Sequence, residues 1–129
     1  MKNILFVCIE NSNRSQIAQA FANMYGAGKV TAYSAGSRPS GKINPKAIAA
    51  MKEFGYDLTT HSSKSLDDLP DVTFEYAITM GCGDACPLVR ANHRLDWNIP
   101  DPRDMNEEQY WEVIDMIGEK VKELLDDAK

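Results

Sequence analysis

The sequence predicts an α/β domain built on a parallel sheet. Short runs rich in apolar residues at positions 4–7, 30–35 and 76–80 have the length and composition of buried strands. Between them, residues 15–25 and 44–55 carry apolar side chains at helical spacing. Strands that alternate with helices form a parallel sheet whose faces are covered by those helices.

The two helices have sequence signals at their ends. The first closes at Gly26, a residue type that commonly ends helices. The second starts with Asn44 as its cap and Pro45 in its first turn, and Gly55 stops it. Its spacing predicts an inner face formed by Ile48, Met51 and Phe54.

The C-terminal half continues this pattern after a polar interval. Residues 59–71 are expected to form a loop, and residues 94–97 a short further strand. Residues 107–128 predict a long helix whose buried face consists of Tyr110, Ile114, Ile117, Val121 and Leu124. In a parallel sheet, ligands bind beyond the carboxyl ends of the strands. Cys8 and Cys82 follow two of these ends.

Size, composition and charge limit the class of protein. The 129 residues fit one domain, 1–129, with 43% apolar and 26% charged residues. The net charge of −5 and the lack of a basic run argue against a general binder of nucleic acid or acidic membranes. No apolar stretch approaches the ~18 residues of a membrane span, and the first apolar run is too short for a signal-peptide core. We expect a cytoplasmic protein, and a monomer.

The three cysteines do not form a disulfide scaffold. Cys8, Cys82 and Cys86 are an odd number, and in a reducing compartment they are reactive, metal-binding or buried thiols. Zinc is one alternative, with His61 and His93 as further ligands. The Cys-x3-Cys spacing is not the usual one, however, and there is no second cysteine pair. We therefore expect no bound metal.

The stretch CIENSNRS at residues 8–15 predicts an anion-binding loop. It leads from a strand into a helix, where backbone N–H groups lack partners and the helix dipole attracts anions. The guanidinium of Arg14 can hold two oxygens of a tetrahedral oxyanion. The same positive surroundings lower the pKa of the Cys8 thiol, which makes it a nucleophilic thiolate. Ser15 can donate a hydrogen bond to that thiolate, and Asn11 can adopt the left-handed angles of a tight loop.

The expected oxyanion ligands all lie in this loop. They are Ile9, Glu10, Asn11, Ser12, Asn13, Arg14 and Ser15. A lone cysteine at a strand end is commonly a packing residue. Cys-x5-Arg-Ser between a strand and a helix favours the catalytic interpretation instead. An ATP-binding loop is excluded because no Gly-x4-Gly-Lys-Ser/Thr motif occurs.

Five motifs in order along the chain carry a family resemblance. They are CIENSNRSQIA from residue 8, YSAGS at 33–37, NPKAIAAMKEFGYDL from 44, CGDACP at 82–87 and DP at 101–102. They resemble the low-molecular-weight protein tyrosine phosphatase superfamily and, within it, the thiol-dependent arsenate reductases. The resemblance implies a flavodoxin-like three-layer domain. It also implies a four-stranded parallel sheet and a phosphatase-like anion-binding loop after the first strand.

The resemblance also implies a general acid. In the Asp-Pro motif of this superfamily, the aspartate that corresponds to Asp101 gives a proton to the departing oxygen. Pro102 restricts Asp101 to extended backbone angles and so holds it in a loop. Asp104 is the alternative acid.

In the arsenate reductases that the chain resembles, further thiols supply electrons. The resemblance implies a Cys8–Cys82 disulfide, followed by a Cys82–Cys86 disulfide that thioredoxin reduces. Only three residues separate Cys82 from Cys86 here, fewer than is usual in the thioredoxin-linked branch. Glutathione or mycothiol with a glutaredoxin-like partner is therefore the alternative reductant. Asn13 stands where many members have a second loop cysteine.

Two other functions stay open. A low-molecular-weight phosphatase would hydrolyse phosphomonoesters through a Cys8 phosphocysteine, although no aromatic residue directly follows the Asp-Pro motif to contact a phosphotyrosine ring. A non-enzymatic sensor would use the thiols only as ligands for an oxyanion or arsenite. Some reductases also bind potassium through acidic side chains. Gln19 and Lys64 stand at those positions, and the lysine ammonium is expected to take the place of the cation.

Overall fold

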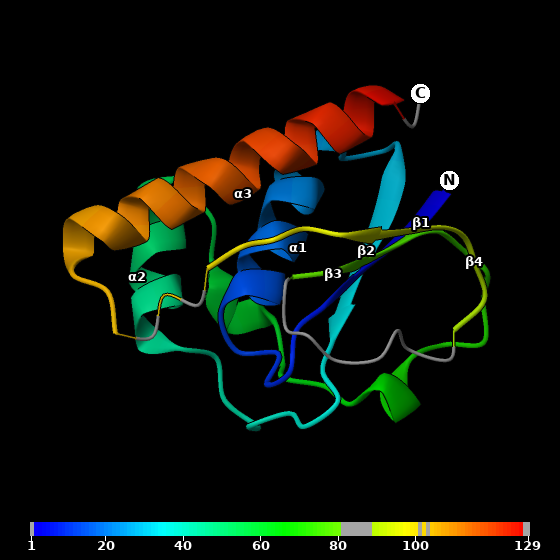
Figure 1. Cartoon of the computed structure of the whole chain (residues 1–129), viewed down its shortest axis with the longest axis horizontal. Helices are drawn as coiled ribbons and strands as arrows, with labels where there is room; N and C mark the ends of the chain where they lie inside the picture. Colours follow the sequence, from blue (N-terminus) through cyan, green and yellow to red (C-terminus); the bar gives the residue numbers. More distant parts are fainter. Residues whose placement is uncertain (1, 81–88, 101, 103, 128–129) are drawn as a thin grey trace.

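A four-stranded parallel sheet in the order β2-β1-β3-β4 forms the centre of the computed structural model (Figure 1). The structure describes residues 2–80, 89–100, 102 and 104–127, with the side chain of 127 excepted. The strands are β1 (Lys2–Val7), β2 (Val30–Ala35), β3 (Phe74–Thr79) and β4 (Ala91–Asp96). The helices are α1 (Arg14–Tyr25), α2 (Pro45–Glu53) and α3 (Glu107–Asp127), with 3-10 turns η1 (Leu58–Thr60) and η2 (Leu66–Asp68). The predicted α/β fold with a four-stranded parallel sheet is confirmed. The three α-helices contribute to the apolar cluster on one face, and η2 with its flanks, not an α-helix as expected, covers the other face.

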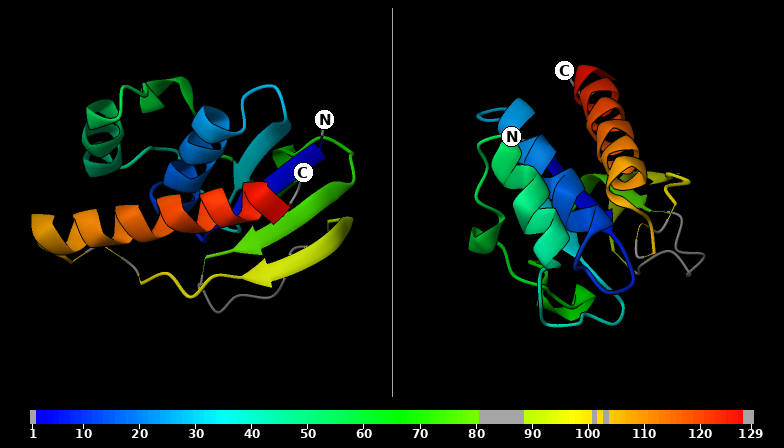
Figure 2. Two further views of the ribbon diagram at one scale, coloured as in Figure 1. Left: turned by 90° about the horizontal axis from the view of Figure 1, so that it is seen from above. Right: turned by 90° about the vertical axis from the view of Figure 1, so that its left-hand side faces the viewer.

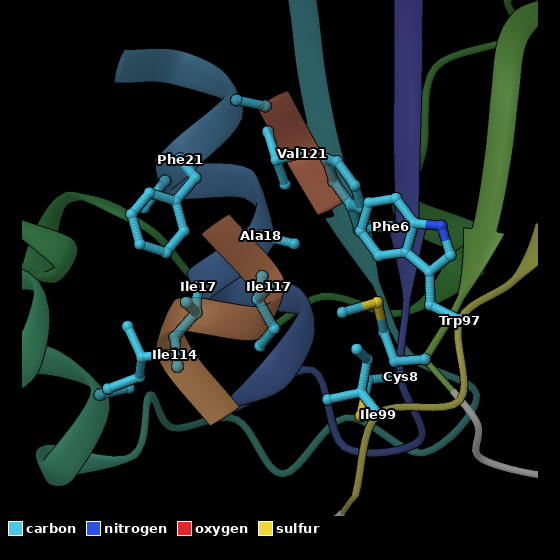
Figure 3. Close-up of a cluster of buried hydrophobic side chains, with 14 of the residues drawn as sticks. Phe6, Cys8, Ile17, Ala18, Phe21, Trp97, Ile99, Ile114, Ile117 and Val121 are labelled. Atoms are coloured by element: carbon cyan, nitrogen blue, oxygen red, sulfur yellow. The ribbon is translucent and has the colours of Figure 1, made fainter. Parts of the chain in front are cut away.

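Helices α1 and α3 pack side by side over one face of the sheet, and α2 packs against α1 (Figure 2). A large apolar cluster fills the space between these helices and the sheet (Figure 3). It includes Phe6 of β1, Phe21 of α1 and Ile117 of α3, all at most 1% exposed. A smaller cluster lies on the other face of the sheet, where residues of η2 and its flanks pack against Leu5 and Phe74.

Strand β1 is central, and this position explains its uninterrupted apolar run. Ile4 and Phe6 belong to the large cluster, whereas Leu5 and Val7 belong to the small one. Successive side chains of a strand point to opposite faces, so a strand buried on both faces needs an apolar residue at every position.

The edge strand and the second helix differ from the sequence prediction. The strand was expected at residues 94–97, but β4 begins at Ala91. Its first four residues are polar or small, and none of its residues is fully buried, so its start carries no apolar signal. Phe54 is 41% exposed, and the expectation that it belongs to the inner face of α2 is wrong. The helix ends at Glu53, so Phe54 is the C-cap residue and does not continue the buried face of the helix. Ala47, Ala50 and Met51 form the buried face instead.

The polar interval before β3 contains two short 3-10 turns rather than a featureless loop. Asp57 caps η1 by accepting the Thr59 N–H at 3.0 Å. Ser65 and Asp68 form a capping box at η2. Among the described residues, no helix is long and apolar enough to cross a membrane.

Candidate active site

Three strands end at the same level, and Cys8 lies at the centre of the edge that they form. The register pairs Val7 of β1 with Ala35 of β2 and with Thr79 of β3. The Cys8 N–H donates to the Ala35 carbonyl at 3.2 Å, and the Met80 N–H donates to the Val7 carbonyl at 3.1 Å. This is the edge of a parallel sheet at which ligands bind.

From Cys8 the chain turns tightly into the N-terminus of α1. Asn11 is fully buried and has a φ of 49°, the left-handed conformation expected for it. The turn packs directly on Gly36, where a Cβ would lie 2.6 Å from the Cys8 carbonyl oxygen and 2.4 Å from that of Ile9. Only glycine allows this close approach of the two backbones.

The turn encloses a cavity of about 110 Å³. Its lining residues are Cys8, Ile9, Glu10, Ser12, Asn13, Arg14 and Asn44. The volume is well below the ~300–1,000 Å³ of pockets for drug-sized ligands, so it suits a small ion. The cavity therefore brings the predicted nucleophile, the predicted guanidinium and most of the predicted loop ligands to one place.

The side chain of Arg14 is buried and anchored by backbone carbonyls. It is 7% exposed. Its Nη1 donates to the Met80 carbonyl at 2.9 Å and to the Ile99 carbonyl at 2.8 Å. These bonds fix the plane of the guanidinium beside the cavity. They also tie α1 to the chain that leaves β3 and to the chain that follows β4.

Asn11 and Ser15 form a hydrogen bond inside the loop. Asn11 Nδ2 donates to Ser15 Oγ at 2.9 Å, and Asn11 Oδ1 accepts the Lys64 N–H at 2.7 Å. Because the Ser15 oxygen is the acceptor in this bond, its own hydroxyl hydrogen can be donated to another group. Donation to the Cys8 thiolate stays a prediction.

Gln16 supports the loop from behind, and it was not singled out from the sequence. It is fully buried although it lies in the first turn of α1. Its Nε2 donates to the carbonyls of Asn11 and Ser62, each at 3.0 Å. Its Oε1 therefore accepts from His61 Nδ1 at 2.9 Å, and His61 Nε2 accepts from the Tyr56 hydroxyl at 2.5 Å.

The imidazole in this chain of hydrogen bonds is neutral at neutral pH. Burial, reinforced by the positive charge of Lys64, lowers the pKa of His61 to about 4. Both ring nitrogens are engaged, so His61 is not positioned as the zinc ligand considered from the sequence. His93 stacks on Tyr76 on the edge strand and faces Glu75 at 3.7 Å. Within the described ranges, no group of three metal-binding side chains occurs.

Of the two positions expected to replace a potassium site, Lys64 contacts the loop and Gln19 bonds to β2. Gln19 Oε1 accepts from the Ser34 hydroxyl at 2.5 Å, and its Nε2 donates to the Ala32 carbonyl at 3.2 Å. Lys64 is bonded to Asn11 through its backbone, and its charge acts on His61. That its ammonium takes the place of a cation stays a prediction.

Three predicted site residues lie outside the described residues: Cys82, Cys86 and Asp101. Met80 immediately precedes the segment that contains the two cysteines, and Ile99 lies two residues before Asp101. Both carbonyls accept from Arg14, as described above. The alternative acid Asp104 is exposed.

Tyr110 also reaches the loop, although the sequence predicted it only as a core residue. Its hydroxyl donates to Asn13 Oδ1 at 2.9 Å. Such a contact between residues so far apart in the chain leaves no local sequence signal. A second cavity, of about 450 Å³, lies between α2 and the start of α3, and Tyr110 and Trp111 are among its lining residues.

Comparison with known proteins gives consistent matches over the whole chain. The sequence model of the family described as low molecular weight phosphotyrosine protein phosphatase matches residues 3–129. A glutaredoxin arsenate reductase from Synechocystis sp. is 34% identical over 128 residues, which cover 97% of each chain.

Solved structures agree with these matches. An arsenate reductase in a phosphate-binding state superposes with a TM-score of 0.91 at 33% identity, and the match covers 100% of both chains. A thioredoxin-dependent arsenate reductase from Corynebacterium glutamicum has a TM-score of 0.79 at 33% identity. That match covers 99% of the present chain and 62% of the other.

Proposed function

The chain belongs to the low molecular weight phosphotyrosine protein phosphatase family, and on that premise we propose that it is an arsenate reductase. The similarity to arsenate reductases over 97–100% of this chain carries the choice of arsenate over a phosphomonoester. The geometry supports the chemistry, because Cys8 and Arg14 line one cavity of ionic size.

The first step is formation of an adduct on Cys8. Arg14 and the N–H groups of the loop and of α1 bind the arsenate oxygens. The Cys8 thiolate attacks arsenic, a sulfur–arsenic bond forms, and one oxygen leaves as water after it takes a proton from Asp101. Arsenic is still in its +5 state at this point, because no electrons have been transferred to it.

The second step is reduction. The Cys82 thiolate attacks the Cys8 sulfur, a Cys8–Cys82 disulfide forms, and the electron pair of the broken sulfur–arsenic bond stays on arsenic, which leaves as arsenite. The Cys86 thiolate then attacks Cys82, restores the Cys8 thiolate and leaves a Cys82–Cys86 disulfide. Thioredoxin, or a small thiol with a glutaredoxin-like partner, reduces that disulfide with two electrons. We further propose that the protein acts as a single-domain monomer in the cytoplasm.

One experiment separates this function from phosphomonoester hydrolysis. The same preparation is assayed for arsenite production and for aryl-phosphate hydrolysis, with thioredoxin and with glutathione plus glutaredoxin in turn. Cys8→Ser should abolish both activities. Cys82→Ser should abolish arsenate turnover only, because the phosphatase route uses Cys8, Arg14 and Asp101.

The outcome of the thiol variants identifies the relay. Cys86→Ser should permit one turnover and then accumulate a Cys8–Cys82 disulfide that peptide mapping detects. Full turnover of Cys86→Ser with a small thiol would replace the last protein step by that thiol. Aryl-phosphate hydrolysis without arsenite production would identify the chain as a phosphatase, the second candidate that the Cys8 and Arg14 geometry supports.

A further inference from the structure

Asn13 is the N-cap residue of α1, but its side chain does not cap the helix. Its backbone carbonyl accepts the Ile17 N–H at 2.9 Å, so the helix begins here. An asparagine in this position normally accepts an N–H of the first helical turn through its side chain. With φ at −133° and ψ at −88°, Asn13 forms no such bond. The Asn13 side chain therefore accepts no hydrogen bond from the N–H groups in the first turn of α1.

The amide oxygen of Asn13 is held by Tyr110 instead. The Tyr110 hydroxyl donates to Oδ1 at 2.9 Å. Tyr110 is 5% exposed, and its ring belongs to the same apolar cluster as Ile114 and Ile117 of α3. Burial raises the pKa of Tyr110, so its hydroxyl stays protonated and remains a donor. A donor fixed in the core thus sets the orientation of the Asn13 amide.

The remaining polar atom of this side chain is a hydrogen-bond donor. The amide nitrogen Nδ2 carries two hydrogens. In the part of the chain that the structure describes, Tyr110 makes the one side-chain hydrogen bond of Asn13. Asn13 is only partly buried, and it lines the small cavity together with Cys8 and Arg14. A tetrahedral oxyanion presents acceptor oxygens, to which an amide N–H is complementary.

We propose that Asn13 Nδ2 donates a hydrogen bond to a bound oxyanion, and that Tyr110 is the positioning residue that holds the amide for this contact. The inference rests on the proposed function and adds a side-chain ligand to the site. It also gives α3 a direct connection to the anion loop. Because Tyr110 binds the amide oxygen, the amide keeps its nitrogen toward the anion. The opposite orientation would place the amide oxygen against the oxygens of the anion, which repel it.

Phosphate binding tests the proposal without requiring turnover. Inorganic phosphate is titrated against the rate of Cys8 alkylation by iodoacetamide, and its protection gives an apparent Kd. Asn13→Ala should weaken phosphate about 10-fold or more, as expected for one hydrogen bond to a charged group. Tyr110→Phe should weaken it by a smaller factor, because the amide is present but no longer oriented. Tyr25→Phe, a partly exposed tyrosine at the far end of α1, is the matched control and should bind as wild type.

Two further variants separate a ligand from a structural brace. Asn13→Asp keeps an acceptor for the Tyr110 hydroxyl but replaces the donor with a carboxylate that repels the anion, so it should bind phosphate more weakly than Asn13→Ala. If Asn13 only stabilises the fold through its bond with Tyr110, the opposite order is expected. The aspartate variant would then be closest to wild type in both thermal stability and phosphate affinity. The double variant Asn13→Ala/Tyr110→Phe should bind no more weakly than Asn13→Ala alone, because both changes remove one contact.

The outcomes distinguish this inference from the proposed function. Phosphate protection in the wild type with equal affinity in Asn13→Ala overturns the inference and leaves the anion loop intact. Absence of protection in the wild type overturns the anion loop itself, and with it both proposals. Should Tyr110→Phe lose its fold, Asn13→Asp against Asn13→Ala decides the question, because residue 13 is partly exposed and its side chain does not cap the helix.

Discussion

Replacing His61 with glutamine tests the hydrogen-bond chain that supports the anion loop. His61 Nδ1 donates to Gln16 and its Nε2 accepts from Tyr56, an arrangement that only the neutral ring can make. Glutamine also offers one donor group and one acceptor, but it does not titrate. The variant therefore removes a pH-dependent contribution to folding and keeps hydrogen-bonding capacity at the same position.

The sign and size of that contribution follow from the two pKa values. The pKa of His61 is about 4 in the folded protein, against 6.5 for an unperturbed histidine. Between these values the unfolded chain binds more protons, so the free energy of unfolding rises with pH. The stabilisation is fully present above pH 6.5 and is lost as the pH falls through about 4. At 1.36 kcal/mol per pKa unit the shift corresponds to about 3 kcal/mol. This is an upper limit because solvent screens the partly exposed side chain, so we expect about 1–3 kcal/mol.

Urea unfolding of wild type and His61→Gln between about pH 4 and 7.5 measures this difference. The wild type should lose about 1–3 kcal/mol more than the variant over that interval. His93→Gln, which replaces the other histidine of the chain on the exposed edge strand, is the control for the loss of a histidine. Parallel pH profiles for wild type and His61→Gln, or an NMR-measured pKa near 6.5 for His61, would refute the reasoning.

Three further substitutions address the loop and the acid. Gly36→Ala places a Cβ 2.4 Å from the Ile9 carbonyl oxygen, so it should destabilise the fold in urea by about 1–3 kcal/mol and abolish phosphate protection of Cys8. Arg14→Lys keeps the charge but loses the planar guanidinium, of which Nη1 alone bonds two carbonyls, and initial rates of arsenate reduction should fall at least about 10²-fold. Asp101→Asn should slow formation of the Cys8 adduct in stopped-flow by about 10²–10⁴-fold; a larger effect of Asp104→Asn would mean that the acid is misassigned.

The sequence predicts the elements whose burial pattern is regular. Residues 30–35 were predicted as a strand and form β2 with the same limits. The buried face predicted for α3 is confirmed, because Tyr110, Ile114, Ile117, Val121 and Leu124 are all at most 5% exposed. Prediction was weakest for β4, where an exposed edge strand carries polar residues and has no apolar alternation to detect. The 3-10 turns were not predicted, because a single turn is too short to show a helical period.

At the site, the sequence predicts the residues that share one loop and misses those that support it from elsewhere. Cys8 and Arg14 are six positions apart, and their motif is visible in the sequence. Gln16 lies two positions after Arg14, but its hydrogen-bond partner His61 is 45 residues away. Tyr110 is 97 residues from Asn13. Its apolar ring predicts a core residue, but the sequence does not show whether its hydroxyl has a hydrogen-bond partner. Such contacts are products of the tertiary fold, so local patterns do not contain them.

The position of Arg14 connects anion binding with the proposed electron transfer. Its guanidinium can face an oxyanion only in the orientation that the Met80 and Ile99 carbonyls impose. Those carbonyls belong to the residues from which the chain continues toward Cys82 and toward Asp101. An anion that binds Arg14 therefore contacts the same guanidinium that holds the Met80 and Ile99 carbonyls. We therefore predict that anion binding at Arg14 also affects the chain around Met80 and Ile99, and that a lysine at this position would lose this effect even though its charge could still attract the anion.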